Sequence, residues 1–202
     1  MEIKMRHGGQ ILIDQLKIQG VDRVFCIPGE SYLPALDGLY ESGIQTVVGR
    51  QEGGVAMMAE ASGKLTGRPG IAFVTRGPGA SNASAGIHIA FQDSTPMILF
   101  VGQVDSSHRD REAFQEVDYK KMFSPLAKWV AEIDNIERLP EYISKAFNIA
   151  LSGRPGPVVL SLPEDTLFAK ADIPDAPKAN PSKQMVSEED VNEVIDKLKL
   201  AK

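Results

Sequence analysis

The segment from Val47 to Glu60 reads Val-Val-Gly-Arg-Gln-Glu-Gly-Gly-Val-Ala-Met-Met-Ala-Glu and contains the junction that decides the fold. A short β-branched run ends at Gly49, and small and apolar residues typical of a helix follow. Glu52 lies at this strand-to-helix junction, beside two glycines that let a ligand approach the backbone closely. A carboxylate placed there can serve a ligand at the carboxyl edge of a parallel sheet. The segment alone is equally compatible with a first-turn acid that the helix dipole stabilises.

Helical and strand-like patterns alternate along the rest of the chain. We expect helices at 10–19, 32–41, 53–65, 81–91 and 138–151, and strands at 23–27, 46–48, 71–75, 97–101, 127–131 and 158–162. Several of these strands are apolar almost without interruption, as strands of a parallel sheet covered on both faces are. The sequence therefore predicts an α/β fold, a doubly wound parallel sheet with helices on both faces.

Composition narrows the class of protein. The chain has 202 residues, of which 43% are hydrophobic, and this is enough for one sizeable core. The net charge is -5 with no basic run, so nucleic acid is an unexpected partner. The single cysteine, Cys26, excludes an internal disulfide framework and is expected to be a buried, inert thiol. No apolar run approaches the roughly 20 residues of a membrane span, so we expect no membrane association and a cytoplasmic location.

The composition changes near the C-terminal end. Pro174, Pro177 and Pro181 lie among polar residues and indicate an extended linker. Ser187 then provides an N-cap for a new helix, with Asp190 at the third helical position. We expect a first domain at 1–170, a linker at 171–186 and the start of a further domain, cut short, at 187–202. The alternative is a C-terminal helix that folds back on the first domain.

Four short motifs occur along the chain in a recognisable order. They are Ile27-Pro28-Gly29-Glu30, Thr75-Arg76-Gly77-Pro78-Gly79-Ala80-Ser81-Asn82, Glu112-Ala113-Phe114-Gln115-Glu116 and Gly153-Arg154-Pro155-Gly156-Pro157-Val158. In this order and spacing, and together with Glu52, they resemble the N-terminal, pyrimidine-binding domain of thiamine diphosphate enzymes. The acetolactate synthase-like branch is the most similar. The resemblance covers residues 8–163, and it implies the thiamine diphosphate-binding fold.

The resemblance implies a role in cofactor binding for Glu52 and for the first two motifs. The acid at the position of Glu52 contacts the N1′ nitrogen of the cofactor pyrimidine and favours the tautomer that removes the thiazolium C2 proton. The residues expected to hold the cofactor are Glu52 with Pro28, Gly29, Thr75, Gly77, Pro78, Gly79 and Asn82. From the residues alone, the glycine loop before the helix at 81–91 could also bind phosphate. Its pattern, Gly-x-Gly-x-x-Asn, supports a nicotinamide oxidoreductase only weakly.

Two motifs concern the chemistry that follows cofactor binding. Synthases of this family usually carry Gly where this chain has Glu30, whereas decarboxylases carry Asp, so Glu30 is a candidate catalytic acid. A capping acid before the next helix is the alternative. Phe114 and Gln115 match the synthase pattern and replace the His-His pair of decarboxylases. We expect both residues at the substrate channel, with Gln115 catalytic. Arg109 is a candidate for the substrate carboxylate, or else part of a solvated charged loop.

The resemblance also implies partners. We expect a small 2-oxo acid substrate, thiamine diphosphate, and Mg²⁺ held by a Gly-Asp-Gly…Asn motif in a C-terminal domain that this chain does not contain. FAD is compatible with the family. A central domain follows such a linker in the family, and complete sites form between subunits. We therefore expect the remaining domains and a homodimer or tetramer as partners, and an inactive isolated chain. The three histidines have no ligand spacing, so no metal site is expected. A non-catalytic partner subunit is the alternative of a different class.

Overall fold

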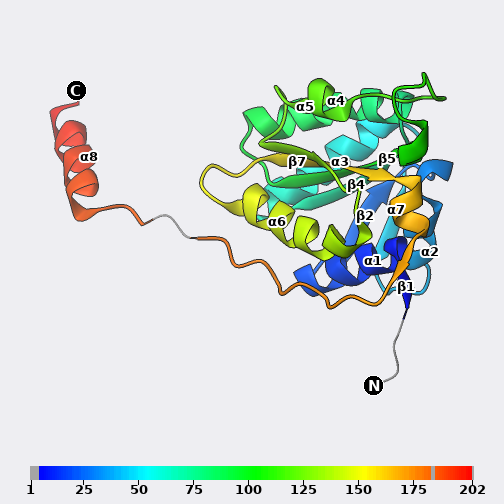
Figure 1. Ribbon diagram of the computed structural model, residues 1–202. Helices are drawn as coiled ribbons and strands as arrows, with labels where there is room; N and C mark the ends of the chain where they lie inside the picture. The colour runs from blue at the N-terminus through cyan, green and yellow to red at the C-terminus, as the bar shows by residue number, and fades with distance from the viewer. Residues whose placement is uncertain (1–4, 183–184, 202) are drawn as a thin grey trace.

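The computed structural model describes residues 5–182 and 185–201, and its centre is a sheet of six parallel strands (Figure 1). The order across the sheet is β3-β2-β4-β5-β7-β6. The strands are β2 (Arg23–Cys26), β3 (Gln45–Val48), β4 (Gly70–Val74), β5 (Met97–Gln103), β6 (Trp129–Glu132) and β7 (Pro157–Pro163). Every residue of β4, β5 and β7 is buried. This burial on both faces explains their nearly continuous apolar sequences.

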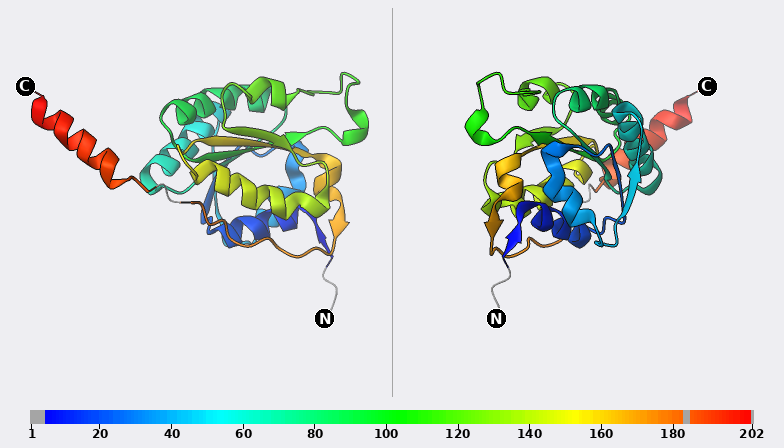
Figure 2. Two further views of the ribbon diagram at one scale, coloured as in Figure 1. Left: turned by 60° about the vertical axis from the view of Figure 1, so that its left-hand side comes forward. Right: turned by 90° about the vertical axis from the view of Figure 1, so that its right-hand side faces the viewer.

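Helices cover both faces of the sheet (Figure 2). One layer contains α1 (Gly8–Gln19), α2 (Leu33–Leu39) and α6 (Leu139–Leu151), and the other contains α3 (Glu52–Thr66), α4 (Pro78–Gln92) and α5 (Tyr119–Phe123). Successive residues of β4 belong to opposite cores, because side chains alternate along a strand. Phe73 packs with the first layer, whereas Ala72 and Val74 pack with the second. The predicted doubly wound α/β fold is confirmed.

Some element boundaries differ from the prediction. Helix α4 begins at Pro78, three residues early, because proline at the first helical position needs no hydrogen bond from its nitrogen. Helix α2 is shorter than expected, since the chain enters it through a 3-10 turn, η1 (Glu30–Tyr32), and leaves it after Leu39. Strand β6 begins at Trp129 and not at Ala127. The short elements η2 (Ser106–His108), α5, η3 (Ile136–Arg138) and α7 (Glu164–Phe168) were not predicted.

A small second sheet pairs the two ends of the domain. Strand β1 (Arg6–His7) runs antiparallel to β8 (Lys170–Ala171). Residues 172–179, called the strap below, then lie along α1. Arg6 contacts Asp175 at 2.8 Å and donates to the carbonyl of Ile173 at 2.9 Å. Gln19 donates to Pro177 O at 3.3 Å and accepts from Ala179 N at 2.9 Å. The first part of the predicted linker is thus fixed on the domain surface.

The last helix, α8 (Glu188–Leu200), begins as predicted. The hydroxyl of Ser187 accepts from the backbone N–H of Asp190 at 3.1 Å. Every described residue of α8 is exposed. The predicted domain 1–170 includes residues 1–4, the linker 171–186 includes 183 and 184, and the segment 187–202 includes 202. Those residues lie outside the described part of the chain.

The connections that follow β2 and β4 leave toward opposite faces of the sheet. These strands are neighbours in the sheet. Helix α2, which follows β2, packs on one face, whereas α4, which follows β4, packs on the other. Ligands of open α/β sheets bind at the carboxyl edge where successive connections leave toward opposite faces. The loops after β2 and β4 contain the first two predicted motifs, so the fold brings them to one place.

Candidate functional site at the carboxyl edge

The loops after β2 and β4 touch at Gly29 and Thr75. A Cβ atom added to Gly29 would lie 2.6 Å from Thr75 Cβ and 2.9 Å from its Oγ1. No larger residue fits there unless the loops move apart. The hydroxyls of Ser31 and Thr75 share a hydrogen bond of 2.9 Å, which fixes the same contact from the other side. Pro28 precedes this contact and is exposed. Glycine at position 29 therefore lets two motif-bearing loops approach each other.

Glu52 is the first residue of α3 and is half-buried. The Gln51 side chain caps the helix, since its Oε1 accepts from the backbone N–H of Gly54 at 2.9 Å. Glu52 Oε2 accepts a hydrogen bond of 2.9 Å from Nδ2 of Asn82. A Cβ atom on Gly79 would lie 3.6 Å from the other carboxylate oxygen, Glu52 Oε1. The carboxylate thus lies beside a glycine backbone and an amide, both from the first turns of α4.

The loop after β4 turns sharply at Gly77. Its φ of 54° and ψ of -111° require a residue without a side chain. The backbone N–H of Gly77 donates to the phenol oxygen of Tyr119 at 2.8 Å. Burial raises the pKa of Tyr119 to about 12, so this phenol stays neutral at physiological pH. Pro78 is exposed at the start of α4. Tyr119, which was not predicted, therefore fixes the conformation of a predicted cofactor loop.

The loop that contains Phe114 and Gln115 packs on the same turn. A Cβ atom on Gly77 would lie 2.8 Å from Gln115 Cβ. Gln115 adopts a φ of 63°, which is unusual for a residue other than glycine and is found most often at functional sites. Phe114 is 73% exposed at the same edge. The structure therefore brings both predicted channel residues to the cofactor loop.

Glu116 fixes the shape of this loop. Its carboxylate accepts from the backbone N–H groups of Asp110 at 2.8 Å and Ala113 at 3.2 Å. The hydrogen bond from Asp110 is the main cause that lowers the pKa of Glu116. An ionised side chain thus holds the backbone on which Phe114 and Gln115 lie.

Arg76 is the buried cation of the site, with 8% of its surface exposed. Its Nη2 donates to Glu30 Oε1 at 2.9 Å, its Nε donates to the carbonyl of Phe114 at 3.1 Å, and its Nη1 pairs with Glu164. Glu30 begins η1, and the structure gives neither η1 nor α2 a side-chain cap. Glu30 therefore does not serve as the helix cap that was the alternative. It pairs with Arg76.

Arg109 lies beside the end of β6. Its guanidinium forms an ion pair with Glu132, the last residue of β6. Glu132 also accepts from the hydroxyl of Ser161 at 2.9 Å. In the described part of the chain, Arg109 forms no hydrogen bond or ion pair with Glu52 or Glu30. Its role in binding substrate stays a prediction. Cys26, by contrast, is a free and buried thiol, and burial raises its pKa, as expected for an inert residue.

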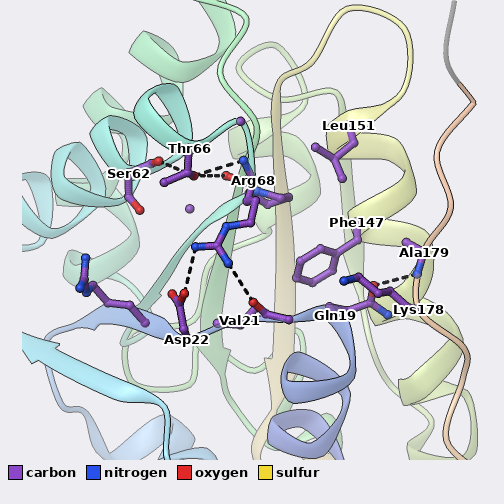
Figure 3. A pocket seen from close by; sticks show the side chains of 15 residues that line it. Gln19, Val21, Asp22, Ser62, Thr66, Arg68, Phe147, Leu151, Lys178 and Ala179 are labelled. Atoms are coloured by element: carbon purple, nitrogen blue, oxygen red, sulfur yellow. Dashed lines mark hydrogen bonds and ion pairs between the residues drawn. The ribbon is translucent and has the colours of Figure 1, made fainter.

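A separate hollow of about 140 Å³ lies at the opposite, amino edge of the sheet (Figure 3). Arg68 lies in it and donates to Asp22 at 2.9 Å and to the carbonyl of Gly20 at 3.2 Å. Lys178 and Ala179 of the strap border it (Figure 3). This hollow contains none of the predicted site residues. Over residues 5–182 and 185–201, no three His, Cys, Asp or Glu side chains form a group able to hold a metal ion.

Comparison with known proteins identifies the family of the chain. Residues 6–122 match the family described as thiamine pyrophosphate enzyme, N-terminal TPP binding domain, and the chain belongs to that family. It is 42% identical over 159 residues to the mitochondrial acetolactate synthase catalytic subunit of Aspergillus candidus, which covers 78% of this chain and 23% of that protein. It is 37% identical over 167 residues to acetolactate synthase isozyme 2 large subunit of Escherichia coli K12, covering 83% and 30%.

A third relative extends the match toward the C-terminal end. The chain is 33% identical over 200 residues to acetolactate synthase of Bacillus subtilis 168, covering 96% of this chain and 34% of that protein. The chain thus spans about a third or less of the length of these relatives. The predicted resemblance to an acetolactate synthase-like N-terminal domain is confirmed. Among the helices of the described residues, none is both long and apolar enough to cross a membrane.

The residues present fit the cofactor that the family implies. A pyrimidine ring needs a flat space and a carboxylate at one ring nitrogen. Glu52 offers the carboxylate, and a Cβ atom on Gly79 would lie 3.6 Å from its Oε1 and 2.8 Å from Thr75 Cγ2, so Glu52, Thr75 and the Gly79 backbone approach one another closely. Asn82 holds the other carboxylate oxygen and so fixes the orientation of the acid. Four predicted motif residues, Gly29, Thr75, Gly77 and Gly79, border the same edge through the close approaches described above.

Proposed function

We propose that this domain holds the aminopyrimidine of thiamine diphosphate at the carboxyl edge of its sheet, within an enzyme that joins carbon units derived from 2-oxo acids. The observation that carries the proposal is the Glu52 carboxylate, which accepts from Asn82 at 2.9 Å and lies beside the Gly79 backbone. The acetolactate synthases among the relatives support this reaction class.

Each residue at the edge has a task in this proposal. Glu52 holds a proton at a ring nitrogen of the pyrimidine, and Asn82 keeps the carboxylate turned toward the ring. Pro28, Gly29, Thr75, Gly77, Pro78 and Gly79 form the backbone surface against which the ring lies. The bound cofactor supplies carbanion stabilisation, which no amino-acid side chain provides. Phe114 and Gln115 border the path of the substrate, with Gln115 positioned to contact it.

Non-oxidative decarboxylation of a 2-oxo acid is the second candidate. Glu30 favours it, because its carboxylate is 68% exposed at the same edge while Arg76 holds one of its oxygens at 2.9 Å. An acid in that position can protonate the carbanion that remains after decarboxylation, whereas in a synthase that carbanion attacks a second substrate. A non-catalytic domain is less well supported, because such a domain has no need of an acid oriented as Glu52 is.

The remaining parts of the enzyme follow from this reaction. We propose that Mg²⁺ and the diphosphate are held by a C-terminal domain, that the 2-oxo acid is a free small molecule in the cytoplasm, and that FAD is a compatible additional cofactor. The isolated chain should bind thiamine diphosphate weakly and should not turn over substrate.

The surface of α3 and α4 supports a homo-oligomer, either a dimer or a tetramer. Met57 and Met58 on α3 are 45% and 36% exposed, and Ile89 on α4 is 36% exposed. These two helices pack on each other and flank Glu52. Exposed apolar side chains near a site favour an interface. Sedimentation of the chain should show self-association, and Met58→Lys should weaken it.

The proposal is tested by Glu52→Gln in the complete enzyme. Gln keeps the shape of the side chain but cannot share a proton with the pyrimidine. Turnover and exchange of the cofactor C2 hydrogen with deuterium should fall about 10²–10⁴-fold, the range of a positioned acid–base group. Glu141→Gln is the matched control, because Glu141 is also a first-turn acid but lies on α6 and pairs with Arg138. Undiminished C2 exchange in Glu52→Gln would remove Glu52 from the mechanism.

A further inference from the structure

Arg76 joins the loops of four neighbouring strands. It lies directly after β4, and its partners come after the strands on either side. Glu30 follows β2, Phe114 lies in the loop after β5, and Glu164 begins α7 after β7. Strands β2, β4, β5 and β7 are consecutive in the sheet. One guanidinium therefore contacts the loops of four adjacent strands at the carboxyl edge on which the candidate site is built.

The contacts of Arg76 exclude one role and favour another. All three of its nitrogens donate to protein acceptors, and its side chain is 9% exposed. This burial and these contacts argue against a direct contact between Arg76 and a substrate carboxylate. The N–H donors of a guanidinium lie in one rigid plane, so Arg76 can hold its three acceptors in a fixed relative orientation. The carboxylate of Glu30 keeps one oxygen on Arg76, while the residue as a whole is exposed toward the site.

We propose that Arg76 is a positioning residue that orients Glu30 and the backbone at Phe114 relative to each other, and thereby sets the ratio of carbon–carbon bond formation to protonation. The inference rests on the proposed function. Arg76 touches neither substrate nor cofactor in this arrangement. Its two effects differ in chemistry, because Glu30 needs a cation whereas the Phe114 carbonyl needs a donor at a fixed angle. Lysine can supply the first and not the second.

The experiment compares Arg76→Ser and Arg76→Lys with the wild-type complete enzyme. Arg154→Ser is the control, because Arg154 also donates to three acceptors, Ser94, Phe91 and Gln92, but away from Glu52. Hydrogen–deuterium exchange is followed in the segments 27–32 and 104–118. Product ratio, kcat and KM are measured with pyruvate.

We expect Arg76→Ser to speed exchange in both segments about tenfold, as loss of charge-assisted hydrogen bonds predicts. It should also lower kcat more than it raises KM and change the product ratio. Arg76→Lys should return the product ratio toward wild type while exchange in 104–118 stays fast. Arg154→Ser should leave both segments and the product ratio unchanged.

Three results would overturn the inference. Exchange in both segments could stay at wild-type rates in Arg76→Ser, or the same change could appear in Arg154→Ser, which would show only a general loss of stability. A product ratio that stays at the wild-type value in both Arg76→Ser and Arg76→Lys would show that Arg76 does not set the ratio of carbon–carbon bond formation to protonation. If the wild-type enzyme does not act on 2-oxo acids, the proposed function fails and the partitioning claim fails with it. The exchange data still decide whether Arg76 positions the two segments. Should Arg76→Ser not fold, Arg76→Lys decides through the exchange in 104–118.

Discussion

The phenol oxygen of Tyr119 accepts a hydrogen bond from the backbone N–H of Gly77, and the two atoms lie 2.8 Å apart. Tyr119 is 2% exposed and belongs to α5, whereas Gly77 turns the loop that leads into α4. A buried N–H group needs a partner. The shape of the proposed cofactor loop therefore depends on a residue 42 positions further along the chain.

Tyr119→Phe should remove that partner and keep the ring. We expect a loss of about 1–3 kcal/mol in the free energy of unfolding, the cost of an unsatisfied buried donor. Cofactor affinity should fall as well, because the Gly77 turn loses its anchor. Urea unfolding measures the first effect and calorimetry the second. Tyr40→Phe is the control, since Tyr40 is 76% exposed. Equal stability of the two variants would show that the hydrogen bond contributes nothing.

The loop held by Glu116 should loosen in acid. Because hydrogen bonds in the folded protein lower the pKa of Glu116, the carboxylate stabilises the loop above the ordinary glutamate pKa of about 4.3. That contribution is lost as the pH falls through the lowered folded pKa. A tryptophan at Phe114, in a Trp129→Phe background, reports the mobility of the loop by fluorescence anisotropy.

Two variants of that reporter protein sharpen the pH test. Glu116→Gln should show low anisotropy already at pH 7, because an amide presents only one oxygen to the two backbone N–H groups. Glu112→Gln in the same loop is the control and should behave like the parent protein. Anisotropy that stays constant from pH 6 to 3 in the parent would contradict the proposed role of Glu116.

Gly29→Ala should separate the loops after β2 and β4. The new Cβ would lie 2.6 Å from Thr75 Cβ, and overpacking of this kind costs about 1–3 kcal/mol. Gly54→Ala is the matched control, because a Cβ atom there meets nothing within 4 Å. It should be neutral or stabilising by up to about 1 kcal/mol. Thermal unfolding compares the two. A Gly29→Ala protein as stable as Gly54→Ala would mean that the two loops separate without cost.

Glu30→Gly should test the choice between synthase and decarboxylase chemistry. With pyruvate, we expect the complete enzyme to release mainly acetolactate. If Glu30 delivers a proton, the variant should lose aldehyde and gain acetolactate. Quantification of both products in wild type and variant gives the ratio. An identical ratio in the two proteins would mean that Glu30 has no part in partitioning.

The fold could be predicted where burial alone dictates the sequence. Strands such as Met97–Gln103 are covered on both faces, so nearly every residue is apolar and the pattern is unambiguous. Glycine stops such as Gly20 and Gly67 also marked true helix ends. Five-residue helices such as α5 were missed, because one turn and a half cannot show a helical period.

The site could be predicted only as far as its motifs are local in sequence. A pattern indicates Glu52, Asn82 and Gly79, and in the structure Glu52 is hydrogen-bonded to Asn82 and lies near Gly79. The partners of Arg76 lie 46, 38 and 88 positions away in the chain, so nothing local indicated them. Arg109 was assigned by its nearness to Phe114. The loop between them turns at Asp110 and Glu112, which have positive φ angles, so the sequence alone does not give the distance between Arg109 and Phe114.

The pairing of β1 with β8 brings the first and last strands of the domain side by side. Arg6 lies opposite Ala171, and neighbouring strands are about 5 Å apart. A few residues would therefore suffice to join Ala171 to Arg6. New chain termini could be introduced at Gly43, which lies in an exposed turn where a Cβ atom would meet nothing within 4 Å. Such a circular permutant would keep every strand pair of the six-stranded sheet and the whole carboxyl edge.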